Sequence, residues 1–202
     1  MALARALAPR PSRVWLDDPF STLAVVVRLY LRQEVRSILK VGGASGIFVT
    51  HDQQEALAIA DRVAVMRSGQ IEQLASPEEI YGQPASQFIA DFVTQANFLE
   101  ARRRSDGWYT ALGLVDESQV QPTDAIAGTL MVRQEELHLG SVNSNEKALV
   151  ICDREFLGRE YKYTLTHPTQ GNLQVRTPTR FAIGDAVQIT IKPNPPGLRV
   201  FA

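Results

Sequence analysis

Two short polar segments each follow an apolar run, and their side chains are of the types that handle Mg²⁺ and phosphate. Asp17 and Asp18 come directly after residues 14–16, Val-Trp-Leu, and His51 follows residues 47–49, Ile-Phe-Val. One carboxylate could hold Mg²⁺ while its neighbour orients a water molecule. An imidazole can present one donor and one acceptor to a phosphate oxygen or to an attacking water. The two segments are therefore candidates for a phosphate-handling site.

Each segment also has a structural interpretation that involves no ligand. One aspartate could cap the turn before Pro19 while the other is solvated, and a lone histidine at a strand end is more often structural. The order of the two segments favours a site, because open α/β sheets bind ligands at the C-terminal ends of neighbouring strands.

The first half of the sequence must fold so that both segments reach one edge of a sheet. Its short apolar runs alternate with helical patterns, which is typical of α/β units and a mainly parallel sheet. Residues 14–16 and 47–49 are expected to be buried strands. Apolar residues recur at helical spacing over residues 25–40, which predicts an amphipathic helix that ends at Gly42 and Gly43.

Further local signals follow in the first half. Asp52 and Glu55 have the spacing of a capping box at the start of a helix. The apolar runs 63–66 and 71–74 flank a turn-like spacer and predict a hairpin. Residues 76–79, Ser-Pro-Glu-Glu, combine a serine cap with a proline at the first helical position and a glutamate at the third, which predicts a helix start.

Beyond Phe98 the residue pattern changes to short β-rich runs separated by turn residues, which suggests a small barrel or sandwich. The expected strands are residues 108–112, 128–133, 148–152, 161–166, 173–176 and 187–191. We therefore predict two domains, residues 1–96 and residues 97–202.

The composition is that of a folded protein and excludes several classes. With 202 residues, 45% of them hydrophobic and 21% charged, the chain can bury a core and is neither disordered nor fibrous. Its 21 Lys and Arg nearly cancel its 22 Asp and Glu, which argues against a nucleic-acid partner. The single cysteine, Cys152, can form no internal disulfide and indicates a reducing compartment. No stretch approaches the roughly 18 apolar residues of a membrane span.

Together with the residues around them, the two polar segments resemble two sequence motifs of a known family. Residues 17–23, Asp-Asp-Pro-Phe-Ser-Thr-Leu, resemble the Walker B and D-loop segment of ATP-binding-cassette (ABC) ATPases. Residues 47–56, which run from Ile-Phe-Val-Thr-His to Glu-Ala, resemble the switch-histidine segment of that family. Residues 62–81 continue the match, and residues 1–7 resemble the helix that follows the family's LSGGQ signature.

The resemblance implies roles for individual residues, with ATP and Mg²⁺ as cofactors. Asp17 matches the aspartate that supports Mg²⁺, usually through water, and His51 matches the histidine that contacts the γ-phosphate. Ser21 lies in the same segment and is expected, with Asp17 and His51, among the nucleotide-binding residues. Asp18 stands where the family has its catalytic glutamate, so Asp18 and His51 are the expected catalytic residues.

The sequence departs from the family pattern at places that bear on catalysis. Asp18 is one methylene shorter than glutamate, about 1.5 Å in reach, and misplacements near 1 Å can cost about a hundredfold in rate. Ala24 replaces the D-loop aspartate that communicates across the ATPase dimer. The sequence contains neither LSGGQ nor a G-x-x-x-x-G-K-[ST] phosphate loop, and the glycine-rich residues 42–46 lack the lysine. The family is an ATPase, but these departures leave open whether this chain is itself an enzyme.

The second half resembles the TOBE domain, a small OB-like regulatory domain found in some import ATPases. Residues 97–99, Asn-Phe-Leu, resemble its opening, and residues 131–135 resemble its Val-Arg-Pro-Glu run, with Gln134 in place of the proline. Residues 153–161 are similar to a segment of ferric-iron importers, whereas the first half would equally suit sulfate, polyamine or sugar importers. The expected fold is the C-terminal part of an α/β P-loop ATPase domain, followed by a small all-β, OB-like TOBE domain.

The resemblance implies an N-terminally truncated ATP-binding subunit that couples ATP hydrolysis to solute uptake, with ferric iron as one candidate solute. Its expected partners are membrane-spanning permease subunits, a second ATPase subunit and, indirectly, a periplasmic binding protein. The expected location is the cytoplasm, peripheral on the inner face of the plasma membrane. The alternative is a non-catalytic regulatory or assembly module, or a relic that lacks ATPase activity.

The remaining candidates are interpreted as structure. Residues 102–104, three arginines, could touch phosphate or lipid but are expected to be a solvated turn. His138 and His167 lack partners at metal-ligand spacing. Three further residues are expected in or near the core: Cys152, Trp15 and Trp108.

Overall fold

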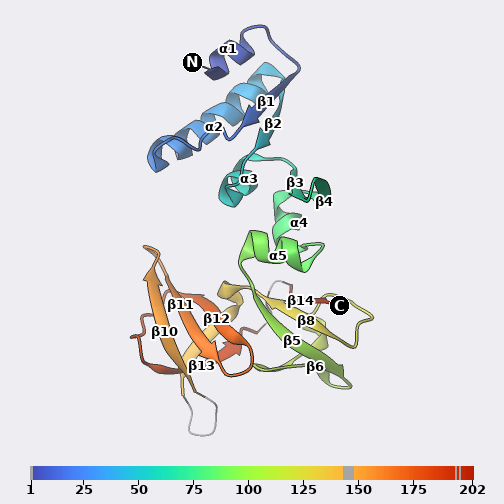
Figure 1. Cartoon of the computed structure of the whole chain (residues 1–202), viewed down its shortest axis with the longest axis vertical. Helices are drawn as coiled ribbons and strands as arrows, with labels where there is room; N and C mark the ends of the chain where they lie inside the picture. Colours follow the sequence, from blue (N-terminus) through green and yellow to red (C-terminus); the bar gives the residue numbers. More distant parts are fainter. Residues whose placement is uncertain (1, 143–147, 194, 196) are drawn as a thin grey trace. The chain divides into compact units, whose positions relative to one another are not determined.

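The computed structural model describes residues 2–142, 148–193, 195 and 197–202, and Figure 1 traces the chain. The chain divides into two compact units, Met1–Ile80 and Tyr81–Ala202. This division falls before the change of sequence texture near Asn97, so residues 81–96 group with the β-rich unit. The assignment of domains to residues 1–96 and 97–202 stays a prediction.

In the first unit, helices alternate with strands, as the spacing of its apolar residues predicts. Its elements are α1 (Ala2–Leu7), β1 (Arg13–Asp17), α2 (Val25–Gly42), β2 (Ser45–Val49), α3 (Gln53–Ile59), β3 (Val63–Arg67) and β4 (Gln70–Ala75), with α4 (Pro77–Gly82) at its end. Strands β1 and β2 pair in parallel, with Trp15 opposite Ile47 and Asp17 opposite Val49. The C-terminal ends of both strands therefore meet at one edge, where the two polar segments begin.

Helix α2 connects the two parallel strands, and its apolar side contributes to the core of this unit. The buried core residues are Val14, Phe20, Val35, Leu39 and Ile59. The helix is capped by Gly43, which has a φ of +66° in the left-handed region that favours glycine. The predicted helix and its glycine stop are confirmed.

The prediction that β1 and β2 are buried strands is wrong. Trp15 is 75% exposed, and Ile47 and Val49 are 42% and 54% exposed. Parallel strands are buried on both faces only where helices and neighbouring strands cover them. Within the described residues β1 pairs only with β2, so Val14 is the one residue of the two apolar runs that is buried in the core, with Leu16 and Phe48 partly buried against it.

The hairpin and the helix after it form as predicted. Strands β3 and β4 pair antiparallel, from Val63 opposite Ala75 to the turn. Ser76 then caps α4, because its Oγ accepts the N–H of Glu79 at 3.3 Å while its own N–H donates to Glu79 Oε2 at 2.9 Å. These reciprocal bonds form the predicted capping box.

The second unit consists of helix α5 (Gln87–Thr94) and two five-stranded antiparallel sheets, with the orders β14-β8-β5-β6-β7 and β12-β11-β10-β13-β9. Their bounds are β5 (Asn97–Arg104), β6 (Gly107–Thr110), β7 (Gly113–Val115), β8 (Ala127–Val132), β9 (Leu137–Ser141), β10 (Leu149–Phe156), β11 (Tyr161–His167), β12 (Gly171–Thr177), β13 (Ala186–Ile191) and β14 (Arg199–Phe201). The six predicted strands are confirmed as β6, β8, β10, β11, β12 and β13, and β5, β7, β9 and β14 are additional. The predicted small all-β, OB-like fold is confirmed.

One core fills this unit, and Trp108 belongs to it as predicted. Its fully buried members include Leu99, Leu130, Leu165 and Val175, contributed by both sheets. Burial alternates along β5, β11 and β12, which is the period of two expected of strands with one buried face. In β8, by contrast, three consecutive residues are buried, Leu130, Met131 and Val132.

A buried polar cluster anchors the start of this unit to its sheets. Gln134 donates through Nε2 to the Gln95 carbonyl at 2.9 Å and to Gln174 Oε1 at 2.7 Å. Gln134 Oε1 accepts from Arg176 Nε at 2.9 Å. Beside it, Arg133 donates to the Tyr81 carbonyl at 2.6 Å. The glutamine that replaces the expected proline therefore contributes three hydrogen bonds of its own.

Trp15 is exposed instead of lying in or near the core, and the predictions for residues 102–104 and Cys152 are also wrong. Residues 102–104 lie in β5 rather than in a turn, and Arg103 pairs with Glu117 and donates to the Thr123 carbonyl at 3.1 Å. Cys152 is exposed instead of buried. The pairing of β10 shifts register between Ile151 and Asp153, and such a bulge re-aims the side chain that it contains.

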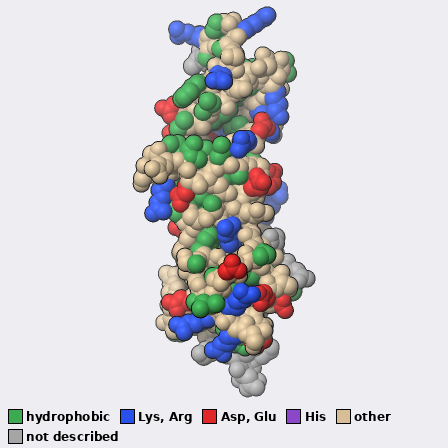
Figure 2. Space-filling model, turned by 90° about the vertical axis from the view of Figure 1, so that its right-hand side faces the viewer, with side chains coloured by type: hydrophobic (Ala, Val, Ile, Leu, Met, Phe, Trp, Pro, Cys, Tyr) green, Lys and Arg blue, Asp and Glu red, His purple; other side chains and the backbone are tan. Residues whose placement is uncertain are grey.

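The distribution of charged side chains on the surface is consistent with the nearly balanced charge of the sequence. On the face shown in Figure 2, acidic and basic side chains are interspersed with hydrophobic ones, and neither sign dominates. None of the helices in the described part of the chain is long and apolar enough to cross a membrane.

Candidate functional site

The candidate residues lie in two turns that begin where β1 and β2 end. Asp18 has a φ of +42°, which is uncommon for a residue with a side chain and is tolerated best by aspartate and asparagine. Its N–H donates to the carbonyl of Val49 at 2.8 Å. The first turn is therefore tied to the end of β2, two residues before His51.

The structure brings His51 and Asp18 together, as their positions after neighbouring strands predict. His51 Nδ1 lies 3.1 Å from Asp18 Oδ2. Both side chains reach solvent, with 79% of His51 and 41% of Asp18 exposed. Because Nδ1 is engaged by the carboxylate, Nε2 is the ring atom available to a ligand.

A pocket of about 210 Å³ opens between the two turns. Ser21 lines it with Asp18 and His51, and donates its hydroxyl to the carbonyl of Asp18 at 3.0 Å. Asp17 is exposed at the end of β1 but does not line the pocket, in keeping with the opposite directions of successive strand side chains. The structure thus gathers three of the four predicted site residues and leaves Asp17 outside the pocket.

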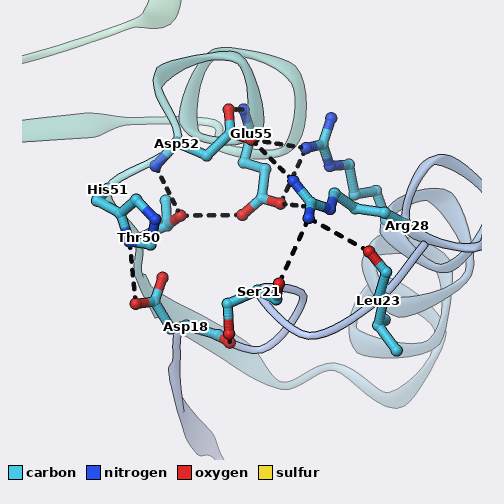
Figure 3. A network of polar contacts seen from close by, with 9 residues as sticks. Asp18, Ser21, Leu23, Arg28, Thr50, His51, Asp52 and Glu55 are labelled. Carbon is cyan, nitrogen blue, oxygen red and sulfur yellow. Dashed lines mark hydrogen bonds and ion pairs between the residues drawn. The ribbon is translucent and has the colours of Figure 1, made fainter. Parts of the chain in front are cut away.

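Charged side chains that were not predicted as site residues also line this pocket, namely Arg28, Asp52 and Glu55 (Figure 3). Glu55 is only 4% exposed, and its two carboxylate oxygens accept from Arg32 Nη2 and Thr50 Oγ1, both at 2.9 Å. Asp52 Oδ2 accepts from Arg32 at 3.4 Å and from Arg28 at 3.3 Å. Two arginines of α2 therefore face two carboxylates at the start of α3.

The predicted capping box at α3 forms only in part. Asp52 caps the helix, since its Oδ1 accepts the N–H of Glu55 at 3.1 Å. The N–H of Asp52 donates instead to Thr50 Oγ1 at 3.1 Å, because the Glu55 side chain is engaged by Arg32. A weak signal was present in the sequence: Arg28 and Arg32 are four residues apart on a helix, a like-charge spacing that is mildly destabilising and is relieved by nearby carboxylates.

In the part of the chain that the structure describes, the carboxylates near the two turns do not form a metal-binding cluster by themselves. Within the ranges that the structure describes, no three His, Cys, Asp or Glu side chains are grouped to hold a metal ion. Mg²⁺ needs only one or two carboxylates when substrate phosphates and water supply its other ligands. Of the two adjacent carboxylates, Asp18 lines the pocket and Asp17 lies outside it at the end of β1.

Comparison with known proteins shows which proteins the chain resembles. Residues 130–196 match the model of the TOBE domain. The chain is 41% identical over 186 residues to "Spermidine/putrescine import ATP-binding protein PotA" of Pseudomonas fluorescens, an alignment that covers 88% of this chain and 50% of that protein. Over most of its own length the chain is similar to the ATP-binding subunits of ABC importers.

Two more ABC importer ATP-binding subunits show the extent of the match. "Spermidine/putrescine import ATP-binding protein PotA 1" of Pseudomonas aeruginosa is 37% identical over 203 residues, covering 95% of this chain and 55% of the relative. "Sulfate/thiosulfate import ATP-binding protein CysA 2" of Chromobacterium violaceum is 47% identical over 137 residues, covering 68% of this chain and 37% of that protein. The chain spans about half the length of the relatives it matches.

The names of these ABC importer subunits bear on the solute. They refer to polyamines and to sulfate or thiosulfate, so the ferric iron expected from residues 153–161 receives no support from them. Among solved structures, a cytoplasmic molybdate-binding protein matches 48% of this chain and 89% of its own at 11% identity. Its TM-score of 0.34 is too low to indicate a shared function.

Proposed function

We propose that this chain supplies the Walker B and switch-histidine part of an ABC importer's ATP-binding subunit, together with its TOBE domain. The contact between His51 and Asp18 carries the proposal, because it places a ring nitrogen and a carboxylate on one pocket at the ends of two parallel strands. Open α/β sheets bind their ligands at such an edge.

In this proposal each side chain has a separate task in ATP hydrolysis. Asp18 accepts a proton from the attacking water and orients it. His51, as an imidazolium whose Nδ1–H donates to Asp18, donates from Nε2 toward the γ-phosphate. Asp17, at the end of β1 beside the pocket, would hold Mg²⁺ through water, and Ser21 would contribute to the nucleotide-binding turn. Magnesium bound to ATP would neutralise the charge that develops on the phosphates.

The proposal requires a phosphate loop that these 202 residues do not encode. Backbone N–H groups and a lysine of such a loop supply most of the contacts to the phosphates in P-loop proteins. We therefore expect this chain by itself to bind ATP weakly and to hydrolyse none. Binding would need a second polypeptide segment that carries the loop and the signature motif.

The proposed partners and location are those of an import ATPase. The subunit would work with membrane-spanning permease subunits, a second ATPase subunit and, indirectly, a periplasmic binding protein, on the cytoplasmic face of the membrane. The names of the relatives favour a polyamine or sulfate as the solute over ferric iron. The permease and the binding protein, rather than this chain, would contact it.

A regulatory or assembly module without ATPase activity is the second candidate. Two departures from the family pattern favour it: Asp18 shortens the catalytic carboxylate, and Ala24 removes the D-loop aspartate. In that case the TOBE domain would act on a partner while the first unit served only to dock.

Calorimetry with Mg-ATP distinguishes the two candidates. The full chain is titrated alone and after mixing with a separately expressed N-terminal segment of the Pseudomonas fluorescens relative, chosen to carry a phosphate loop. Micromolar binding in the mixture, beyond that of the segment alone, is the result expected of a functional ATPase part. Absence of added binding in the mixture would favour the regulatory module, and micromolar binding by the chain alone would contradict the need for the loop.

A further inference from the structure

Arg28 contacts both of the turns that carry the candidate catalytic residues. Its Nη2 donates to the carbonyl of Leu23 at 3.3 Å and to that of Ser21 at 3.5 Å, in the turn that follows Asp18. Its Nη1 donates to Asp52 Oδ2 at 3.3 Å, in the turn that contains His51. One guanidinium therefore spans the pocket wall from one turn to the other (Figure 3).

The remaining contacts hold this guanidinium in a defined orientation. Arg28 Nε lies 3.7 Å from Glu55 Oε1, and Glu55 is itself fixed by Arg32 and Thr50. The Arg28 side chain is 24% exposed, so solvent competes only in part for its donors. Arg28 Nε itself has no hydrogen-bond partner, so the planar guanidinium is oriented through Nη1 and Nη2, which bond to the two different turns.

Burial of these charges is poorly explained by stability alone. The buried pair of Arg32 with Glu55 loses much of its Coulombic gain to desolvation, and apolar residues of the same volume would often stabilise a fold as well. The half-buried pair of Arg28 with Asp52 loses part of its gain in the same way. Geometric specificity is what such a cluster adds. Its donors connect the two turns at the place where the separation of Asp18 and His51 is set.

We propose that Arg28 is a positioning residue that clamps the turn after Asp18 to the start of helix α3 and thereby holds Asp18 against His51. Arg28 does not touch the reacting atoms and acts through the two turns. Its importance for hydrolysis rests on the proposed function, whereas the geometric role exists in the chain without nucleotide. A loss of the clamp would let Asp18 and His51 separate, and displacements near 1 Å are large for catalytic groups.

The chain offers a matched control on the same helix. Arg36, two turns further along α2, donates to Asp61 Oδ1 at 2.8 Å and so also connects α2 to the region of α3. It is not among the residues that line the pocket. Arg36→Met therefore removes an arginine–carboxylate bond between the same two regions while leaving both turns untouched.

Nuclear magnetic resonance of the His51 ring in the full chain, without nucleotide, tests the proposal. The chain has three histidines, so the His51 signals are identified by their loss in His51→Gln. Asp18→Asn should change the His51 ring shifts in the wild-type and Arg36→Met backgrounds. In the Arg28→Met and Arg28→Lys backgrounds the same substitution should produce less than half of that change, because lysine keeps the charge but lacks the fork.

An undiminished effect of Asp18→Asn in both Arg28 backgrounds would overturn the proposal. Unfolding of the first unit in both Arg28 variants would also overturn it, since Arg28 would then be required for folding rather than for position. Failure of the chain to bind ATP with any partner segment would leave this result unaffected, so the clamp and the proposed function are tested separately.

Discussion

His51 Nδ1 and Asp18 Oδ2 lie 3.1 Å apart, although 33 residues separate them in the sequence. The parallel pairing of β1 with β2 produces this proximity, because Asp17 and Val49 are opposite each other at the strand ends. The contact also engages the oxygen that would have to orient water. The short side chain of Asp18 thus has to contact His51 and also orient the attacking water. A longer carboxylate could reach further toward the water.

Lengthening that side chain should raise the rate of hydrolysis. In the mixture with a loop-bearing segment, Asp18→Glu extends the carboxylate by about 1.5 Å, and the rate should rise by up to about a hundredfold. Phosphate release under saturating Mg-ATP measures the effect. Asp17→Glu is the matched control and should lower the rate or leave it unchanged, so an equal gain from both substitutions would contradict the assignment of roles.

The buried pair between Arg32 and Glu55 should matter more for stability than the exposed pair between Arg36 and Asp61. Arg32→Met leaves a carboxylate that is 4% exposed without its main partner, a type of change that costs about 3 kcal/mol. Arg36→Met removes a solvent-exposed pair, which costs about 1 kcal/mol or less. Urea unfolding followed by circular dichroism compares the two variants, and equal losses would refute the ranking.

Two substitutions of Gln134 should separate the stability contributed by its side-chain hydrogen bonds from the stability contributed by its backbone conformation. Gln134→Ala removes three hydrogen bonds from a site that is 1% exposed and should cost about 1–3 kcal/mol. Gln134→Pro loses the same bonds, but residue 134 begins a helical turn, where proline is well tolerated. Arg133 before it has a φ of −69° and a ψ of 157°, the extended conformation that proline requires of its predecessor.

The proline variant should therefore be the more stable of the two, by about 0.4–1 kcal/mol gained through the unfolded chain. Thermal denaturation of the three proteins side by side measures the order. If Gln134→Pro melts below Gln134→Ala, the backbone at this turn is less suited to proline than its angles indicate.

The stability of the second unit should fall at alkaline pH. Burial, with the hydrogen bond to Glu135, raises the pKa of the Tyr81 phenol above its usual value near 10. A raised pKa in the folded state means that the stabilisation is complete below about pH 10 and is lost as the pH rises further, because the unfolded chain then releases a proton that the folded chain retains. Tyr81→Phe should weaken this decline.

Urea unfolding at intervals between pH 8 and pH 12 measures the slope for wild type and variant. Tyr109→Phe serves as a comparison, since a hydrogen bond to Asp106 raises the pKa of Tyr109 at an exposed position. Identical alkaline slopes for wild type and Tyr81→Phe would show that Tyr81 does not supply the effect.

The sequence predicts those parts of the fold that local chemistry determines. Gly43 ends α2, and Ser76 with Glu79 begins α4, because φ and backbone hydrogen bonding at a helix end depend on a few adjacent residues. The proximity of Asp18 and His51 follows from the order of two strands. These features need no knowledge of what packs around them.

The features that the sequence could not predict depend on neighbours distant in the chain. Trp15 lies in an apolar run yet is 75% exposed. The run itself does not indicate which face of the strand other elements cover, so this exposure could not be predicted. Residues 102–104 are part of strand β5, although three consecutive arginines do not show the apolar pattern of a strand. A bulge in β10 turns Cys152 outward. Arg28 was a polar position of an amphipathic helix, and only the folded arrangement shows that it reaches two turns.

The most direct test of the account is the affinity for Mg-ATP of the chain mixed with a loop-bearing segment, compared between wild type and His51→Ala. A hydrogen bond from His51 to a charged phosphate is worth about 1.5–3 kcal/mol, so the dissociation constant should rise about tenfold or more in the variant. An unchanged dissociation constant would contradict the placement of the γ-phosphate at the pocket that Asp18 and His51 share.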